Sequence, residues 1–328
     1  MKARWPWTGL RGIAILMVIG IHSLPKAEGS ALVTALDAAL RPCVAIFLFA
    51  SGYLTAKSGH VPVGKRVRRA LGPYTVAFVA AYLLMAAQNP LIDNRPAIFI
   101  ARYTLAYVFV YYYVFVYIGC TVLLWLVFAA AGQQGADRQP RLIALLSLAV
   151  VAGLAIGAYL DPVLQRLGLS PAVINEARMR DLPFWFAFTA VGAIIGQLAA
   201  EPLLRQWRIA LLGATVLGYT GYALVRVSGV GDAAAYDSLA FFSYALFACL
   251  ALLAVAPRSR MLALLSSASY AIYLWHIFAI VILRPHLASV APAAAFLIKY
   301  IVALVSSVAL VLAAKSLRTP RLARWLGA

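Results

Sequence analysis

LRGIAILMVIGIHS, Leu10 to Ser23, is the stretch that decides the fold. It predicts a helix that crosses a membrane, yet it carries Arg11 and His22 at its two ends. At about 100° and 1.5 Å per residue, the second side chain returns to within roughly 20° of the first, roughly 16 Å further along the axis. Contact between an ionisable group and lipid is costly, so such residues normally face protein or water. We therefore expect one inward-facing polar stripe on this helix.

The composition is that of an integral membrane protein. Of the 328 residues, 64% are hydrophobic and 12% are charged, and the mean hydropathy is +0.90, which is too apolar for a soluble globule. Apolar stretches of spanning length recur about ten times. They lie near residues 8–25, 36–56, 71–88, 110–132, 141–160, 182–200, 207–226, 236–256, 265–284 and 293–314. The sequence thus predicts an all-α membrane protein whose single transmembrane domain fills residues 1–328.

The basic residues predict the orientation of the chain in the membrane. Its net charge is +18, which in a soluble protein would suggest a nucleic-acid partner. An even number of spans places both termini on one side, and most of the 28 lysines and arginines fall on that side. Positive charge marks the cytoplasmic side of a membrane protein. We therefore predict that both termini are cytoplasmic, that the protein contacts membrane lipid and that it has no nucleic-acid partner.

A basic cluster follows the second predicted span, in KSGHVPVGKRVRRALGPY, which we expect to be a cytoplasmic loop. The tendency of positive charge to stay inside the cell accounts for part of it. Arg66 and Arg69 are also one helical turn apart, so that their two guanidinium groups can bind one anionic group. The cluster therefore also fits a phosphate-binding site that includes Lys65 and Arg68.

Two further spans carry polar residues. The ninth, SSASYAIYLWHIFAIVILRP, places Ser269, Tyr273 and His276 on one helical face, and the second, FLFASGYL, contains Ser51 beside a glycine. Hydrogen bonding and close packing between helices explain such residues. They also fit the wall of a site or donors to an oxyanion.

Residues 97–109 fit either a re-entrant or an interfacial helix, because the apolar stretch AIFIARYTLAYVF contains Arg102. The aromatic run from Tyr107 to Tyr117 fits an interfacial belt or a surface on which a substrate stacks. The three cysteines lie singly within apolar runs, so we expect no disulfide and no metal site.

Four motifs, LRGIAILMVIGIHS, FLFASGYL, RVRRALGPY and SYAIYLWH, occur in this order along essentially the full chain. Together they resemble the acyltransferase 3 family of bacterial integral membrane O-acyltransferases. The resemblance implies ten spans, acetyl-coenzyme A or another acyl-coenzyme A as donor, and a carbohydrate acceptor at or beyond the outer face. It also implies a multi-pass protein of the bacterial cytoplasmic (inner) membrane that modifies the cell envelope.

The resemblance also implies roles for individual residues. Arg11 and His22 match the arginine and the essential histidine of the family's first helix. Arg66 and Arg69 match the RxxR pair that serves the donor. The chain departs from the family pattern in having no tryptophan in the Tyr111–Tyr117 region and no acidic residue just before Arg11.

The expected acyl transfer explains why a histidine is needed. A sugar hydroxyl is a poor nucleophile at neutral pH, and a neutral histidine is the usual base that removes its proton. His22 is the expected base, which Glu28 or Asp37 could orient. Direct transfer is favoured because no cysteine or serine has the setting of an activated nucleophile. An acyl-histidine intermediate stays open as the alternative.

A transporter or flippase for a polysaccharide or a lipid-linked sugar is the competing hypothesis. Many spans and charges within the membrane suit it equally well. A carrier, however, has no use for a coenzyme A site, and transporters often show repeated halves or interrupted helices at matching positions. The basic cluster and the stripe of Arg11 and His22 therefore favour the enzyme.

Overall fold

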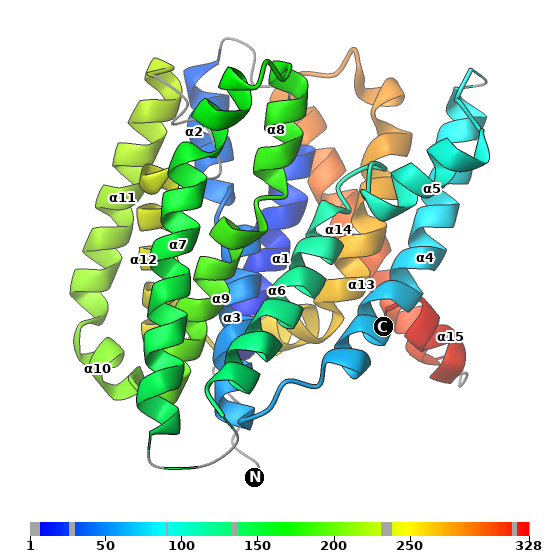
Figure 1. The fold of residues 1–328 in the computed structure, drawn as a ribbon. Coiled ribbons are helices and arrows are strands. Elements are labelled where there is room, and N and C mark those ends of the chain that lie inside the picture. The colour runs from blue at the N-terminus through cyan, green and yellow to red at the C-terminus, as the bar shows by residue number, and fades with distance from the viewer. Residues whose placement is uncertain are drawn as a thin grey trace.

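The computed structural model describes residues 7–25, 30–89, 91–132, 135, 137–230, 238–316 and 320–327. These residues form a bundle of packed helices (Figure 1), and no strand occurs among them. Besides the short 3-10 helix η2 (Pro285–Leu287), the helices are α1 (Trp7–Ser23), α2 (Ala31–Leu40), α3 (Cys43–Ser58), α4 (Val63–Gln88), α5 (Pro96–Thr104), α6 (Tyr112–Ala130), α7 (Arg138–Arg166), α8 (Pro171–Met179), α9 (Leu182–Gln197), α10 (Glu201–Gln206), α11 (Arg208–Ser228), α12 (Leu239–Val255), α13 (Arg260–Leu283), α14 (Pro292–Ser316) and α15 (Pro320–Trp325).

Seven helical stretches of the described chain are long and apolar enough to cross a membrane. They are Ala31–Ser58, Val63–Gln88, Tyr112–Ala130, Arg138–Arg166, Arg208–Ser228, Arg260–Leu283 and Pro292–Ser316. The helices α1 and α12 are also apolar but shorter. The prediction of an all-α membrane protein is therefore confirmed, and the number of ten spans stays a prediction.

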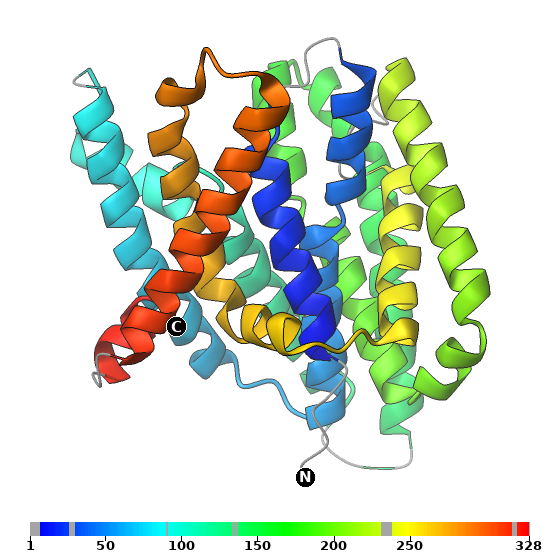
Figure 2. The ribbon, with the colours of Figure 1, turned by 180° about the vertical axis from the view of Figure 1, so that it is seen from behind.

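The two ends of the bundle differ in character. Helix α4 begins at one end, which we call the basic end because its first turns carry Lys65, Arg66, Arg68 and Arg69. Helices α10 and α15 also lie at this end (Figure 1). At the opposite end lie α2, α5 and α8. Helix α1 runs through the middle of the bundle from the basic end towards the opposite end (Figure 2). Arg11 thus lies nearer the basic end and His22 nearer the opposite end.

Helix α1 packs closely against its neighbours because small residues line its first turns. It contacts α13, α3 and α14. A Cβ atom on Gly12 would lie 2.6 Å from the carbonyl oxygen of Leu262, at the start of α13. Leu10, Ala14 and Ile15 are fully buried. The central position of α1 keeps its polar residues away from lipid, as their cost in lipid requires.

We predicted that the basic cluster forms a loop, and this prediction is wrong. The cluster lies within a helix. Helix α4 begins at Val63, eight residues before the predicted span that starts at residue 71. The prediction followed the apolar residues alone and missed the polar turns that extend the helix, although lysine and arginine are good helix formers. Arg66 and Arg69 therefore project from one rigid helix, one turn apart.

The second predicted span, residues 36–56, is two helices. Helix α2 ends at Leu40 and α3 begins at Cys43. Pro42 separates them because proline has no N–H to donate and its ring collides with the preceding turn. The break brings the first residues of α3, Cys43 and Val44, to the wall of the pocket described below.

Residues 97–109 form a short helix, α5, followed by a turn that returns the chain into the bundle. Ala106 and Phe109 have φ angles of 49° and 53°, which residues other than glycine rarely adopt. The Tyr273 hydroxyl donates to the carbonyl oxygen of Val110 at 2.6 Å. Irregular backbone is tolerated inside a membrane protein where other parts of the protein bury it and satisfy its polar groups. We call residues 105–111 the re-entrant turn, because they carry the chain back into the bundle, where Ala106, Val108 and Tyr111 are buried. Whether α5 itself is re-entrant or interfacial in the membrane stays a prediction.

Candidate active site

Helices α1 and α13 bring together the two polar stripes that the sequence places on separate spans. The guanidinium group of Arg11 donates through Nη2 to Ser269 Oγ at 2.9 Å. Arg11 is half-buried and Ser269 is buried. The contact joins residues 258 positions apart and ties the Arg11 side chain to α13.

His22 and His276 face each other further along the same two helices. Their ring centroids lie 5.4 Å apart, and the ring planes make an angle of 35°. His276 is fully buried, whereas His22 is half-buried. The Nδ1 atom of His276 lies 3.0 Å from the carbonyl oxygen of Ile272 and 2.8 Å from that of Tyr273. The two histidines thus form one pair of rings between α1 and α13.

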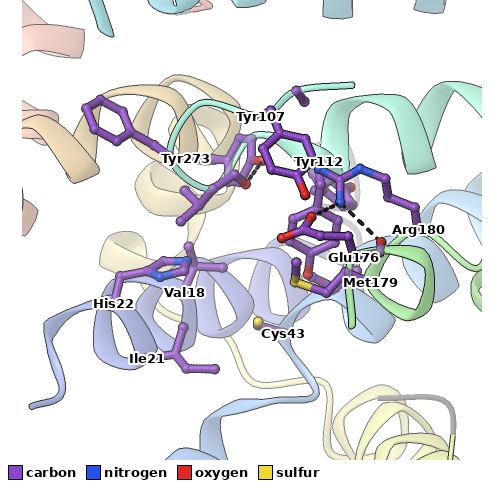
Figure 3. Close-up of a pocket in the computed structure, with 15 residues that line it drawn as sticks. Val18, Ile21, His22, Cys43, Tyr107, Tyr112, Glu176, Met179, Arg180 and Tyr273 are labelled. Atoms are coloured by element: carbon purple, nitrogen blue, oxygen red, sulfur yellow. Dashed lines mark hydrogen bonds and ion pairs between the residues drawn. The ribbon is translucent and has the colours of Figure 1, made fainter. Parts of the chain in front are cut away.

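A pocket of about 200 Å³ opens beside His22. Its walls come from α1, the starts of α3 and α6, the re-entrant turn before α6, the end of α8 with the following Arg180, and α13. Figure 3 shows His22 on one side of the pocket and Arg180 on the other. Tyrosines supply much of the wall, namely Tyr107, Tyr112, Tyr113 and Tyr273. The pocket therefore combines aromatic surface with a histidine and with charged groups.

Arg180 closes the pocket on the side away from His22. Its Nε and Nη2 atoms donate to the carbonyl oxygen of Leu105 at 3.1 and 2.8 Å, and it forms an ion pair with Glu176. Its guanidinium carbon lies 5.1 Å from the centre of the Tyr107 ring. Arg180 thus ties the end of α8 to the re-entrant turn. The sequence offers one signal for these residues, the i,i+4 spacing of Glu176 and Arg180, which is typical of a helical ion pair and does not by itself indicate a site.

The other residues predicted for the site wall differ in their contacts. Tyr273 lines the pocket, and its hydroxyl proton is engaged with Val110, which supports a role in the wall. Ser269 accepts from Arg11 and does not line the pocket. Ser51 lies on α3 towards the basic end, where its carbonyl oxygen accepts from the Thr55 hydroxyl at 2.7 Å.

Arg66 connects the basic end to the interior. Its Nη2 atom donates to Thr55 Oγ1 at 2.6 Å, across the interface between α4 and α3. Its Nη1 atom is buried and makes no hydrogen bond within the described part of the chain. A buried guanidinium nitrogen without an acceptor is unfavourable, since burial removes its water. Arg66 is therefore held by its Nη2 atom, and its Nη1 atom is left without an acceptor among the described residues.

The rest of the basic cluster is exposed. Lys65, Arg68 and Arg69 are open to solvent at the start of α4. Arg68 donates through Nε to the carbonyl oxygen of Gly64 at 3.3 Å. The RxxR pair thus consists of one arginine anchored between two helices and one exposed arginine a turn further along α4.

Glu28 and Asp37 are the acidic residues predicted to orient His22. Glu28 lies outside the described residues. Asp37 pairs with Arg41 at 2.7 Å and with Arg226, and no hydrogen bond described in the structure joins it to His22. The ring of His22 instead lies beside that of His276.

The described residues contain no group of three or more histidine, cysteine or acidic side chains that could hold a metal ion. Cys43, Cys120 and Cys249 are buried and free.

Comparison with known proteins identifies the family. Searches of curated proteins and of solved structures returned no match. A family model described as an acyltransferase domain matches residues 7–314, which is nearly the whole chain and includes both ends of the α1 stripe, the basic cluster and the histidine pair. The chain is a multi-pass membrane protein that belongs to the acyltransferase 3 family.

Proposed function

We propose that this membrane acyltransferase moves an acyl group, in the first instance acetyl, from cytosolic acyl-coenzyme A to a hydroxyl of a carbohydrate at the outer face. One observation carries the proposal: α1 links the two sites that such a transfer needs. Arg11 lies towards the basic end, and His22 lines a pocket towards the opposite end. They are separated by roughly 16 Å along the helix axis.

The basic end suits the donor. Coenzyme A carries several phosphates and cannot cross a bilayer, so its nucleotide must stay on the cytosolic side. Exposed Arg69 and the unpartnered Nη1 atom of Arg66 can bind those phosphates, because guanidinium groups pair with phosphate through two parallel hydrogen bonds. The pantetheine arm would then extend into the bundle towards Arg11 and deliver the thioester near His22.

The chemistry of the step requires one base. His22 takes the proton from the acceptor hydroxyl as its oxygen attacks the thioester carbonyl. The tetrahedral intermediate collapses, the carbon–sulfur bond breaks, and the protonated His22 returns the proton to the departing coenzyme A sulfur. The base ends the cycle neutral, and no covalent enzyme intermediate is needed.

The pocket suits the acceptor. Its volume of about 200 Å³ is below the roughly 300–1,000 Å³ of pockets that enclose drug-sized ligands, which favours one sugar ring at a time. Tyrosine rings offer flat apolar surface to the carbon–hydrogen face of a sugar. Glu176 offers a carboxylate to its hydroxyls at the rim. Since Arg180 already neutralises Glu176, an uncharged sugar fits the pocket better than an acidic one.

Mass spectrometry of the cell-surface glycans, with and without the gene, tests the proposal. We expect one glycan to lose the mass of an acyl group in cells that lack the gene, and a plasmid copy of the gene to restore that mass. A transporter would produce a different result, because the whole glycan would then disappear from the surface. Glycans with unchanged acylation would contradict the proposal.

Arg66→Ala is expected to weaken the binding of acetyl-coenzyme A about 10- to 100-fold, the usual effect of losing hydrogen bonds to a charged group. Titration calorimetry of the purified protein with acetyl-coenzyme A measures this change. Arg258→Ala is the matched control, since Arg258 is an exposed arginine between α12 and α13 outside the cluster. Equal affinity in the Arg66 variant and the wild type would remove Arg66 from the donor site.

A further inference from the structure

The hydrogen bonds of His276 determine which of its ring nitrogens carries a proton. Both groups close to Nδ1 are carbonyl oxygens, those of Ile272 and Tyr273. A carbonyl oxygen only accepts hydrogen bonds, so Nδ1 must carry the hydrogen. In the neutral ring, the Nε2 atom is then left with a free lone pair and acts as an acceptor.

This acceptor has no partner. Nε2 of His276 is buried and makes no hydrogen bond within the described part of the chain, and the whole residue is 0% exposed. A buried polar atom without a partner is unfavourable, and in native proteins it calls for a specific explanation. The ring of His22, 5.4 Å away between centroids, carries an N–H that can meet this need.

His22, in turn, needs a hydrogen-bond acceptor for one of its ring nitrogens. A histidine base works only if the nitrogen that faces the substrate is unprotonated, so its other nitrogen must be held as a donor. In many enzymes a carboxylate accepts from that nitrogen. Asp37 is engaged with Arg41 and Arg226, and no described hydrogen bond joins it to His22. His276 stands where such an acceptor is required, and it adds no negative charge to the interior of the bundle.

We propose that His276 is the positioning residue of this acyltransferase: its Nε2 accepts the N–H of His22 and thereby leaves the other His22 nitrogen free, towards the pocket, to act as the base. The inference rests on the proposed function. The two rings must tilt slightly towards each other to form this hydrogen bond. Hydrogen bonds between catalytic groups are often long in the free enzyme and tighten when the substrate binds. The bond strengthens when His22 takes up the proton, because the donor is then charged.

Two substitutions of His276 test the assignment in vesicles that contain the purified protein and radiolabelled acetyl-coenzyme A. The acceptor is envelope carbohydrate extracted from cells that lack the gene. His276→Leu removes the acceptor atom and is expected to lower kcat about 10- to 100-fold, with the KM for acetyl-coenzyme A unchanged. His276→Gln places an amide oxygen near the position of Nε2 and is expected to restore most of kcat.

A second acceptor separates positioning from structure. Hydroxylamine attacks thioesters without the help of a base, so, once its spontaneous reaction with acetyl-coenzyme A in protein-free vesicles is subtracted, its acetylation by the His276→Leu protein should proceed at the wild-type rate. Equal losses with hydroxylamine and with carbohydrate would show a merely structural role and overturn the inference. So would a His276→Gln protein as slow as His276→Leu, or a His276→Leu protein with full kcat.

The same assay distinguishes failure of the inference from failure of the proposed function. If His22→Ala transfers acetyl to carbohydrate at the wild-type rate, His22 is not the base and both ideas fall. If His22→Ala is inactive while His276→Leu is fully active, His22 remains the base and only the role of His276 is overturned. When the two substitutions are combined, we expect no further loss beyond that of His22→Ala, because both act on one step.

Discussion

Replacing His22 with alanine is expected to lower the rate of acyl transfer to carbohydrate by about 100- to 10,000-fold, the range that general-base catalysis contributes. The other carboxylate or imidazole that lines the pocket is Glu176, whose ion pair with Arg180 makes it a poor substitute for the lost base. The arginines proposed to bind the donor lie at the basic end, and Arg11, nearer that end, is already roughly 16 Å from His22 along α1, so the binding of acetyl-coenzyme A should be unchanged. Transfer of radiolabelled acetyl in vesicles, together with calorimetric titration of the donor, measures both quantities.

Two controls make the result specific to a base. His286→Ala removes an exposed histidine in η2, just beyond α13, and should keep full activity. Added imidazole should restore part of the activity of His22→Ala, because the substitution enlarges a pocket that already exists and imidazole supplies the missing base. Full activity of His22→Ala without imidazole would exclude His22 from catalysis.

The sequence predicts the helical faces of the site well but not the partners of its residues. The spacing of Arg11 and His22 places them on one face of the first helix, and the spacing of Ser269 and His276 does the same for another helix. Helical periodicity concerns neighbours along one helix. It contains no information on which two faces meet, so the bond between Arg11 and Ser269 and the pair of histidine rings emerge only from the packed bundle.

Boundaries and turns were predicted less well, for a related reason. Hydropathy identifies the apolar part of a helix that contacts lipid but not the polar turns that extend the helix beyond it. The start of α4 at Val63 is therefore not predicted from hydropathy. The closure of the pocket by Arg180 depends on the carbonyl oxygen of Leu105, a backbone group that no residue pattern reveals. The break at Pro42 was open to prediction, because proline interrupts a helix, but the apolar residues on either side concealed it.

Gly52→Ala is expected to destabilise the protein by about 3 kcal/mol or more, at the upper end of the range for overpacking a core. Helices α3 and α9 approach so closely that a Cβ atom on Gly52 would lie 1.9 Å from the carbonyl oxygen of Thr189. The reciprocal contact is equally close, since a Cβ atom on Gly192 would lie 2.1 Å from the carbonyl oxygen of Phe49. Backbone atoms cannot rotate away as side chains can, so the two helices must separate. The midpoint of thermal unfolding in detergent should fall markedly.

Gly213→Ala supplies the matched control for this prediction. Gly213 is an exposed glycine within α11, and a Cβ atom there would have no atom within 4 Å apart from the nearby backbone of its own helix. Alanine forms helix better than glycine by about 1 kcal/mol, so this variant should be as stable as the wild type or more so. The same chemical change thus has opposite expected effects at two positions that differ in packing. If Gly52→Ala unfolds at the wild-type temperature, α3 and α9 do not pack as closely as described, and the place of α3 beside the pocket loses its support.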